Sequence, residues 1–475
     1  MQPNILLITT DEQRWDALGI NHPGAIQTPF LDSLAASGTN FTRAYSTCPL
    51  CIPARRTLLS GLHPAHHQTI VNTEGEDFTP PATIPQLVRE QGYQTQLIGK
   101  LHVGIPGKRY GFDHIIQSET PNDRRLMPHQ WRNDYADWLD RALPGQHPLG
   151  LGVMSNDRMA RPYHLPEQFH HNHWATEQAV QFLGTYRDPS QPFYLHLSYW
   201  APHQPLIPPQ AYWERYRDNT HHPVLGEWTT REAWKPGRPP SSPGGPFRLE
   251  EIRQAIAGYY GLINHIDDQL NYLFDRWSCS RLKSDRPLLI LFTSDHGDLM
   301  GDHHLFRKHQ PYEGSAHVPL FMAGRHGYQI PKGSSEALVS LEDVAATVLD
   351  ASGAARPSHF RDDDGWSLLR QLKEEKPFRS CIHGQGYSKS RGSRHHRFLV
   401  MGPWKYIRFT STGEEQLFHL ERDPGERRDV SAEEDLTEFR TRMNQHRDTS
   451  PPGVDWESTV ELRPSANQPP QAVWG

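Results

Sequence analysis

Cysteine is scarce in this chain, with four residues in 475. So few cysteines exclude a disulfide framework as the main source of stability, and a chain of this length can bury a large core without one. The length favours two to three domain-sized units. Cys48 and Cys51 form a Cys-x-x-Cys pair. No second pair and no thioredoxin-like context accompany them, which argues against redox or zinc chemistry.

Long apolar runs and an excess of positive charge are also missing. No run is long enough to span a bilayer. The net charge is −6 and the pI is about 6.6. We therefore expect neither a nucleic acid nor a membrane surface as a partner. The N-terminus enters an apolar strand without a basic leader or cleavage site, which predicts a cytoplasmic protein, or a periplasmic one if a leader has been trimmed.

The first two thirds of the chain alternate short apolar runs with amphipathic segments. This pattern is typical of an α/β fold with a mainly parallel central sheet flanked by helices. A bend or break is expected in the longest helix because of its length. The predicted strands are residues 4–10, 95–98, 193–199 and 288–293, and the predicted helices are residues 29–36, 84–91, 249–277 and 340–349.

The pattern of apolar and polar residues changes after about residue 380. Residues 398–401 and 405–409 flank a Gly-Pro turn and predict a hairpin. A further strand is predicted from Leu417, and a helix is predicted over 433–447. We therefore predict a catalytic domain over 1–385. A smaller α+β subdomain with an antiparallel sheet is predicted over 386–475. Its Pro-rich tail from Ser450 is consistent with a homo-oligomer.

Two stretches, residues 123–166 and 217–247, are rich in Pro, Gly, Trp, Arg and His and resist assignment to regular structure. Long loops of this kind in a compact domain are commonly lids or binding walls. We expect them to form walls of a substrate pocket.

The segment from Cys51 to Gly61, Cys-Ile-Pro-Ala-Arg-Arg-Thr-Leu-Leu-Ser-Gly, predicts a short helix that begins at a thiol. Pro53 suits the first turn of a helix and Gly61 suits its end. Free N–H groups at the start of the helix, together with Arg55, favour a tetrahedral oxyanion. A nucleophile beside such a cradle indicates attack on a sulfate or phosphate ester. The alternative is a helix start with an incidental thiol.

Ionisable side chains follow four of the predicted strands, and ligands of open α/β sheets bind at the carboxyl ends of the strands. These side chains should therefore lie at one edge of the sheet. Most of the candidate metal ligands are oxygen donors, with one imidazole, a set that suits Ca²⁺, Mg²⁺ or Mn²⁺ better than a closed zinc site. The ends of the strands carry Asp11 and Glu12, Lys100 and His102, His203, and Asp295 and His296.

With these motifs in order, the chain resembles the formylglycine-dependent sulfatases of the alkaline phosphatase superfamily. The resemblance runs from Pro3 to about Glu426. It rests on Cys-x-Pro-x-Arg at 51–55 and on short blocks around the four strand ends. It implies an alkaline-phosphatase-like fold, a formylglycine that a maturation enzyme makes from Cys51, and one divalent metal. Calcium is the expected ion, with magnesium or manganese as alternatives, and the expected substrate is a small organic or sugar sulfate.

The resemblance also implies roles for individual residues. Cys51 becomes the nucleophile and Arg55 steadies its hydrate, while His102 takes a proton from the second hydroxyl. His203, together with Lys308, protonates the leaving alcohol. The implied metal ligands are Asp11, Glu12, Asp295, His296 and the modified Cys51, and the residues around the sulfate are Lys100, His102, His203 and Lys308. Two positions depart from the common pattern, because many sulfatases have Asp at the position of Glu12 and Asn at that of His296.

Two other functions stay open. Asn72 follows Cys51 at a spacing similar to that of an oxyanion-binding Asn in the related phosphonate monoester and phosphodiester hydrolases. It is therefore a candidate substrate-binding residue, and such a hydrolase is the main alternative. The Lys100-x-His102 pair favours sulfate instead. A non-catalytic anion- or sugar-binding relative is the remote alternative, which the retained nucleophile and metal ligands argue against.

Overall fold

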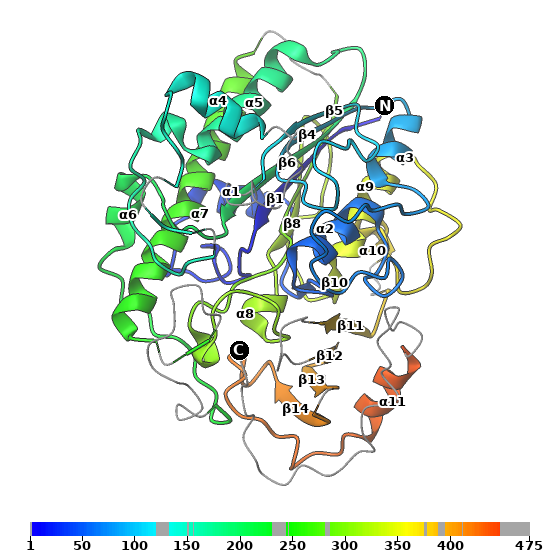
Figure 1. Ribbon diagram of the computed structural model, residues 1–475. Coiled ribbons are helices and arrows are strands. Elements are labelled where there is room, and N and C mark those ends of the chain that lie inside the picture. Colours follow the sequence, from blue (N-terminus) through cyan, green and yellow to red (C-terminus); the bar gives the residue numbers. More distant parts are fainter. Residues whose placement is uncertain are drawn as a thin grey trace.

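The computed structural model describes residues 2–119, 133–149, 152–154, 156–229, 244–245, 247–280, 286–374, 378–387, 395–410 and 412–446. Much of the two predicted loop walls and the whole tail from Ser450 lie outside these residues. The described chain forms a large α/β body and a smaller sheet beside it (Figure 1). None of the described helices is long and apolar enough to cross a membrane.

An eight-stranded sheet forms the centre of the body, in the order β5-β4-β6-β1-β7-β8-β2-β9. β1 pairs in parallel with β6 and β7, whereas β8 runs antiparallel to both of its neighbours. The prediction of a mainly parallel sheet is therefore confirmed. The strands are β1 (Asn4–Asp11), β2 (Thr39–Phe41), β4 (Gln94–Gly99), β5 (His114–Gln117), β6 (Phe193–Pro202), β7 (Leu288–Ser294), β8 (Leu320–Arg325) and β9 (Gly333–Ser335). A separate short pair joins β3 (Ala44–Tyr45) to β10 (Val339–Ser340).

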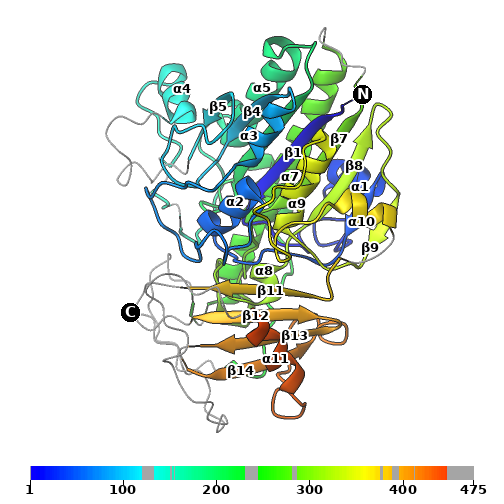
Figure 2. The same ribbon diagram turned by 90° about the vertical axis from the view of Figure 1, so that its right-hand side faces the viewer.

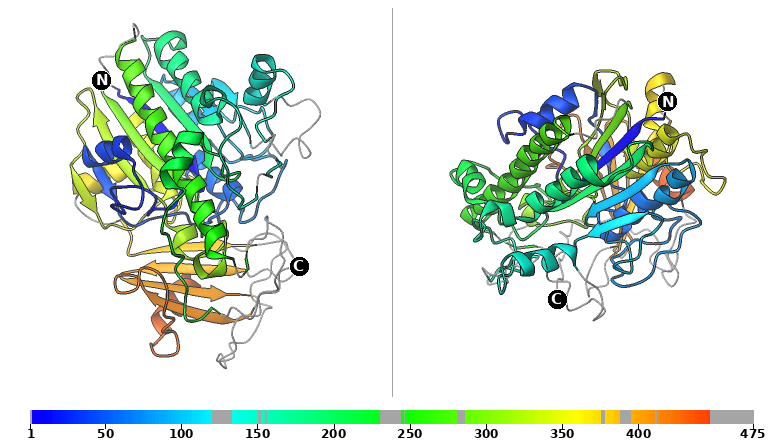
Figure 3. Two further views of the ribbon diagram at one scale, coloured as in Figure 1. Left: turned by 90° about the vertical axis from the view of Figure 1, so that its left-hand side faces the viewer. Right: turned by 90° about the horizontal axis from the view of Figure 1, so that it is seen from above.

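Helices cover both faces of this sheet. Alternate residues of a strand point to opposite faces, and in β1 Leu6 packs into the core on one face while Ile5 packs into the core on the other. The long helix α7 lies on the Leu6 face, which Figure 3 shows in its left view. That face carries α1 (Pro29–Ala36), α5 (His171–Gln181), α6 (Gln210–Tyr216) and α7 (Leu249–Ser278). The Ile5 face carries α2 (Cys51–Ser60), α3 (Ile84–Glu90), α9 (Leu341–Ser352) and α10 (Leu368–Glu374).

Two sequence predictions about helices differ from the structure. α7 is one continuous helix of 30 residues without a break, because its apolar stripe packs along the sheet over its whole length. α4 (Asp134–Ala142) lies inside a stretch that was predicted to lack regular structure. The side chain of Asn133 caps it by accepting a hydrogen bond from the N–H of Ala136, and Tyr135 and Leu139, one turn apart, are buried.

The second sheet is antiparallel, with β11 (Cys381–Gly386), β12 (His396–Met401), β13 (Trp404–Phe409) and β14 (Glu414–His419) in sequence order. The predicted hairpin is confirmed as β12 and β13. One face of the sheet packs on α11 (Thr437–Gln445), and the other packs on the main body near α8 (Glu313–Ala316). Figure 2 shows this sheet below the body. Its first strand begins at Cys381, ahead of the boundary at residue 386.

Candidate active site

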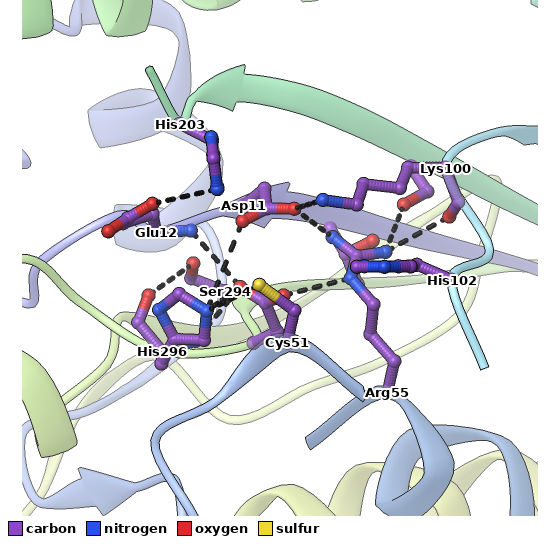
Figure 4. A network of polar contacts seen from close by, with 12 residues as sticks. Asp11, Glu12, Cys51, Arg55, Lys100, His102, His203, Ser294 and His296 are labelled. Atoms are coloured by element: carbon purple, nitrogen blue, oxygen red, sulfur yellow. Dashed lines mark hydrogen bonds and ion pairs between the residues drawn. The ribbon is translucent and has the colours of Figure 1, made fainter. Parts of the chain in front are cut away.

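The carboxyl ends of β1, β4, β6 and β7 meet at one edge of the central sheet. Asp11 is the last residue of β1, Lys100 follows β4, His203 follows β6 and Asp295 follows β7. Their side chains converge in the network of polar contacts that Figure 4 shows. The structure thus brings together the four clusters that the sequence placed at separate strand ends.

The helix that was predicted from the motif at Cys51 forms at this edge. α2 begins at Cys51 and ends before Gly61, whose φ of 75° makes it a left-handed cap. The Cys51 side chain is buried, and its Sγ lies 3.3 Å from Nε2 of His296. Burial acts to raise the pKa of this thiol. The charges of Lys308 and Lys100 outweigh burial and hold the pKa well below its usual range.

Four candidate ligands surround a point next to residue 51. One ligand atom from each of Asp11, Cys51, Asp295 and His296 lies within 4.8 Å of the others. Oδ1 of Asp11 is buried and has no hydrogen-bond partner among the described residues. A buried carboxylate oxygen without a donor is costly unless a cation neutralises it. These residues therefore fit a divalent metal with oxygen and nitrogen ligands.

Glu12 is not one of these four candidate ligands. It belongs to a second group of possible metal ligands, together with Asp11 and His203. Its Oε2 is 3.0 Å from Nζ of Lys308 and 3.3 Å from Nε2 of His203, while its Oε1 is buried without a partner among the described residues. The longer arm of Glu12, compared with the Asp of many sulfatases, carries the carboxylate toward Lys308 and His203.

Arg55 connects the carboxylates of the site. Its Nε donates to Oδ2 of Asp295 at 2.8 Å, and its Nη2 donates to Oδ2 of Asp11 at 3.0 Å. Its Nη1 donates to the hydroxyl of Ser198 and to the carbonyl of Lys100. The guanidinium, expected to steady the hydrate of residue 51, is thus committed to two carboxylates. Nζ of Lys100 adds a contact of 2.6 Å to Asp11. Burial acts to raise the pKa of Asp11, but the charges of Lys100 and Arg55 lower it well below its usual range.

The remaining predicted residues lie around this centre. Nδ1 of His203 is 2.7 Å from the carbonyl of Gln204, whose amide in turn donates to Asp298 at 2.6 Å. Oδ1 of Asn72 accepts a hydrogen bond of 3.1 Å from the N–H of Ile52, at the start of α2. Asn72 therefore braces the helix that carries residue 51.

Sequence reasoning missed three residues that contact the predicted ones. The hydroxyl of Ser198 accepts from Arg55, the backbone carbonyl of Gln204 accepts from His203, and the carboxylate of Glu74 pairs with His102 at 3.0 Å. Ser198 and Gln204 lie on or next to a predicted strand end. Glu74 lies two residues after Asn72, but a lone carboxylate in a loop carries no motif. Its distance in sequence from His102 gives no sign of the contact.

A parallel sheet flanked by helices, with a thiol at a helix start beside carboxylates at the strand ends, defines an alkaline-phosphatase-like hydrolase. The sulfatase family profile matches residues 3–354, and a profile for the C-terminal part of N-sulphoglucosamine sulphohydrolase matches residues 301–450. An arylsulfatase of Clostridium perfringens (strain 13 / Type A) is 33% identical over 446 residues, which cover 90% of this chain and 89% of the relative. The chain belongs to the sulfatase family, and it is a sulfuric ester hydrolase.

Two solved structures confirm the predicted fold. The phosphonate monoester hydrolase of Agrobacterium radiobacter superposes with a TM-score of 0.75 at 23% identity, and the match covers 94% of each chain. A protein solved in complex with its substrate, D-glucosamine-2-N,6-O-disulfate, superposes with a TM-score of 0.72 at 19% identity. That match covers 96% of this chain and all of the other.

Proposed function

We propose that this sulfatase hydrolyses a small organic or sugar sulfate, with a formylglycine derived from Cys51 as its nucleophile and a divalent metal, calcium in the first place, beside it. One observation carries the proposal. Residue 51 stands at the start of α2, and its side chain lies within 4.8 Å of ligand atoms of Asp11, Asp295 and His296. The proposal includes a formylglycine-generating enzyme as a partner during maturation.

The metal and the modified residue would each supply one part of the chemistry. Asp11, Asp295 and His296 would hold the metal, whose charge polarises a sulfate oxygen. The hydrate of a formylglycine offers an oxygen nucleophile and a second hydroxyl. That second hydroxyl is the chemical reason for the modification, because an ordinary Ser would need water to attack the sulfate ester.

The side chains of the chain itself provide charge and protons. Lys100, which is buried, and Lys308, which is partly buried, are cations beside residue 51, and both lower the pKa of its thiol. They are therefore placed to stabilise negative charge that develops on the sulfate oxygens. The hydrogen bond from Nδ1 of His203 to the carbonyl of Gln204 makes Nδ1 the donor. Its Nε2, on the side of Glu12, is then the atom that can hand a proton to the leaving alcohol when both ring nitrogens are protonated.

A sulfate ester, a sugar sulfate among them, is the substrate class that the comparisons support. One structural neighbour has D-glucosamine-2-N,6-O-disulfate as its substrate, and the arylsulfatase relative acts on a sulfate by its name. A phosphonate monoester or phosphodiester is the second candidate. It is favoured by the superposition on a phosphonate monoester hydrolase and by Asn72 beside the start of α2.

A substrate panel separates these candidates. Mature protein with bound calcium is assayed with an aryl sulfate, sulfated sugars, choline sulfate and a phosphate diester. We expect turnover of a sulfate to be fastest, and faster turnover of the diester would reverse the assignment.

The nucleophile is tested by substitution. Cys51→Ala should reduce turnover to background while leaving the melting temperature close to that of the wild type. Cys48→Ala is the matched control, because Cys48 is equally buried but lies outside the group around the metal position. Retained turnover in Cys51→Ala would refute the role of residue 51. The mass of the peptide containing residue 51 shows whether the aldehyde has formed.

A further inference from the structure

The short loop at residues 72–74 contacts two parts of the active site. Asn72 accepts a hydrogen bond from the N–H of Ile52 at the start of α2. Glu74, two residues further along the chain, contacts His102. We propose that Glu74 is a positioning residue that holds His102 in the tautomer and orientation needed to take a proton from residue 51. The proposal rests on the proposed sulfatase function and on the role of base that the family resemblance implies for His102.

The contact between Glu74 and His102 is close and involves both carboxylate oxygens. Nε2 of His102 lies 3.0 Å from Oε2 and 3.2 Å from Oε1 of Glu74. The imidazole is 11% exposed and the Glu74 side chain is 38% exposed, so the pair spans the rim of the site. Burial acts to raise the pKa of Glu74, but the hydrogen bond from His102 outweighs it and lowers that pKa. The carboxylate is therefore ionised and accepts the hydrogen bond.

This contact fixes which nitrogen of His102 carries the proton. A neutral imidazole has one N–H, and a carboxylate can only accept from it. With Nε2–H held by Glu74, Nδ1 is left with a lone pair. Nδ1 is buried and has no hydrogen-bond partner among the described residues. Burial and the charge of Lys100 act to lower the pKa of His102, but the Cys51 sulfur and Glu74 outweigh them and raise it to about 10. The hydrate that the proposed modification makes of Cys51 has no sulfur, so the contribution of the thiol to this pKa is lost in the mature protein. The lone pair is thus available to residue 51, and after proton transfer the carboxylate also stabilises the imidazolium.

The backbone of His102 is held independently of Glu74. Its N–H donates to Oε1 of Glu119 at 2.9 Å, as does the N–H of Leu101 at 3.2 Å, and the φ of His102 is 49°. Glu119 therefore places the residue in its left-handed conformation, and Glu74 is left to orient the ring. Removing the Glu74 carboxylate should therefore change the orientation and tautomer of the His102 ring without unfolding the backbone around His102.

Only the second half of the reaction, the release of sulfate, should need Glu74. His203 and Lys308 serve the departure of the alcohol. In the release of sulfate, a proton moves from the free hydroxyl of residue 51 to Nδ1 of His102. The electron pair of that O–H bond forms the C=O bond as the C–O bond to the sulfate breaks, and water then hydrates the aldehyde again.

The kinetic test uses Glu74→Gln and an aryl sulfate with a good leaving group. General base catalysis contributes about 10²- to 10⁴-fold, so we expect kcat to fall by about 10²-fold. KM should fall in parallel, because slow release makes the modified enzyme accumulate, and kcat/KM should stay within about threefold of the wild type. Mass spectrometry during turnover should show a species heavier by one SO₃ group.

Two further variants sharpen this test. Glu74→Asp should recover part of kcat, because it restores the carboxylate. Glu76→Gln is the control, since it removes the same charge from an exposed position two residues after Glu74 and should leave kcat unchanged. A loss of kcat/KM equal to the loss of kcat, or no loss of kcat, would overturn the positioning role.

A second measurement does not depend on the reaction. ¹⁵N spectra of histidine-labelled mature protein, with His102 assigned through His102→Gln, should show His102 protonated at Nε2 in the wild type. The tautomer population should change in Glu74→Gln, and identical His102 signals in both would refute the proposal. If the substrate panel favours a diester, the sulfate assignment fails while this result still decides the role of Glu74.

Discussion

At the scale of single residues, the site brings like charges together and neutralises them only in part. Oδ2 of Asp11 receives both Arg55 and Lys100, and Oδ2 of Asp295 receives Arg55. Oδ1 of Asp11 and Oε1 of Glu12 receive no donor from the described residues. Ionised carboxylates are buried at a reasonable cost only when they are paired or bind a metal. The cations thus organise the ligands, and the open oxygens leave room for an ion.

This arrangement predicts a stabilising effect of calcium on metal-free protein. At a concentration of 100 times Kd, bound ion should add about 2.7 kcal/mol to the free energy of unfolding, measured as a rise in melting temperature. Asp295→Asn should weaken the apparent affinity for calcium at least about tenfold, because one ligand loses its charge.

Asp77→Asn is the control for this measurement. It removes a carboxylate that pairs with Lys108 on the exposed surface, and the calcium response should stay that of the wild type. A melting temperature of the wild type that does not respond to calcium, magnesium or manganese would contradict a metal at this position.

At the scale of elements, the long helix α7 depends on close packing at its glycines. A β-carbon at position 258 would lie 2.8 Å from the carbonyl oxygen of Leu206 and 2.8 Å from the β-carbon of Ala160. The helix therefore approaches the segment after β6, which carries His203, more closely than any other residue type allows. That contact sets the distance between the helix layer and the edge of the site.

Gly258→Ala should therefore destabilise the protein, although alanine is the better helix former. Overpacking of this kind costs about 1–3 kcal/mol, which urea unfolding can measure. Gly184→Ala is the matched control, because its β-carbon would meet nothing closer than Ser280 at 3.5 Å. We expect that variant to be neutral or slightly more stable. A stable Gly258→Ala protein would show that the layers can move apart.

The helices and strands also show how much of the fold and of the site could be predicted from the sequence. Continuous apolar runs and helix signals such as Pro53 and Gly61 are local, and the strands and α2 that they predicted are present. The prediction failed for α4, where a polar and aromatic composition hides a helix whose stability comes from two buried residues. Contacts such as Glu74 with His102, or Arg55 with Asp295, join distant segments, and only the fold specifies them.

At the scale of the whole molecule, a buried lysine joins the two sheets. Lys405 of β13 is fully buried, and its Nζ lies 2.9 Å from Oε1 of Glu313 in α8 and 3.0 Å from Oε1 of Glu426. Apolar side chains of the small sheet, including Phe398 and Ile407, pack against the main body around it. The ion cluster, together with a hydrogen bond of 2.9 Å from the hydroxyl of Tyr312 to Oε1 of Gln416, therefore fixes the position of the second sheet within a largely apolar contact.

Lys405→Met should be strongly destabilising, because it leaves the buried carboxylate of Glu426 without its cation and leaves Glu313 with only His317. Removing one partner of a buried pair costs about 3–5 kcal/mol, seen as a lower midpoint in urea unfolding. Arg428→Met removes a cation from an exposed pair with Glu433 and should change the midpoint far less. Equal effects of the two substitutions would mean that the cluster does not hold the sheets together.

The burial of residue 51 also bears on whether its proposed modification comes before or after folding. Residue 51 is 2% exposed and lies where the carboxyl ends of β1, β4, β6 and β7 meet. A side chain this deeply buried offers no access to a second protein once the sheet has formed. The proposed maturation enzyme would therefore have to act before the domain folds, and molecules that fold first would keep the thiol.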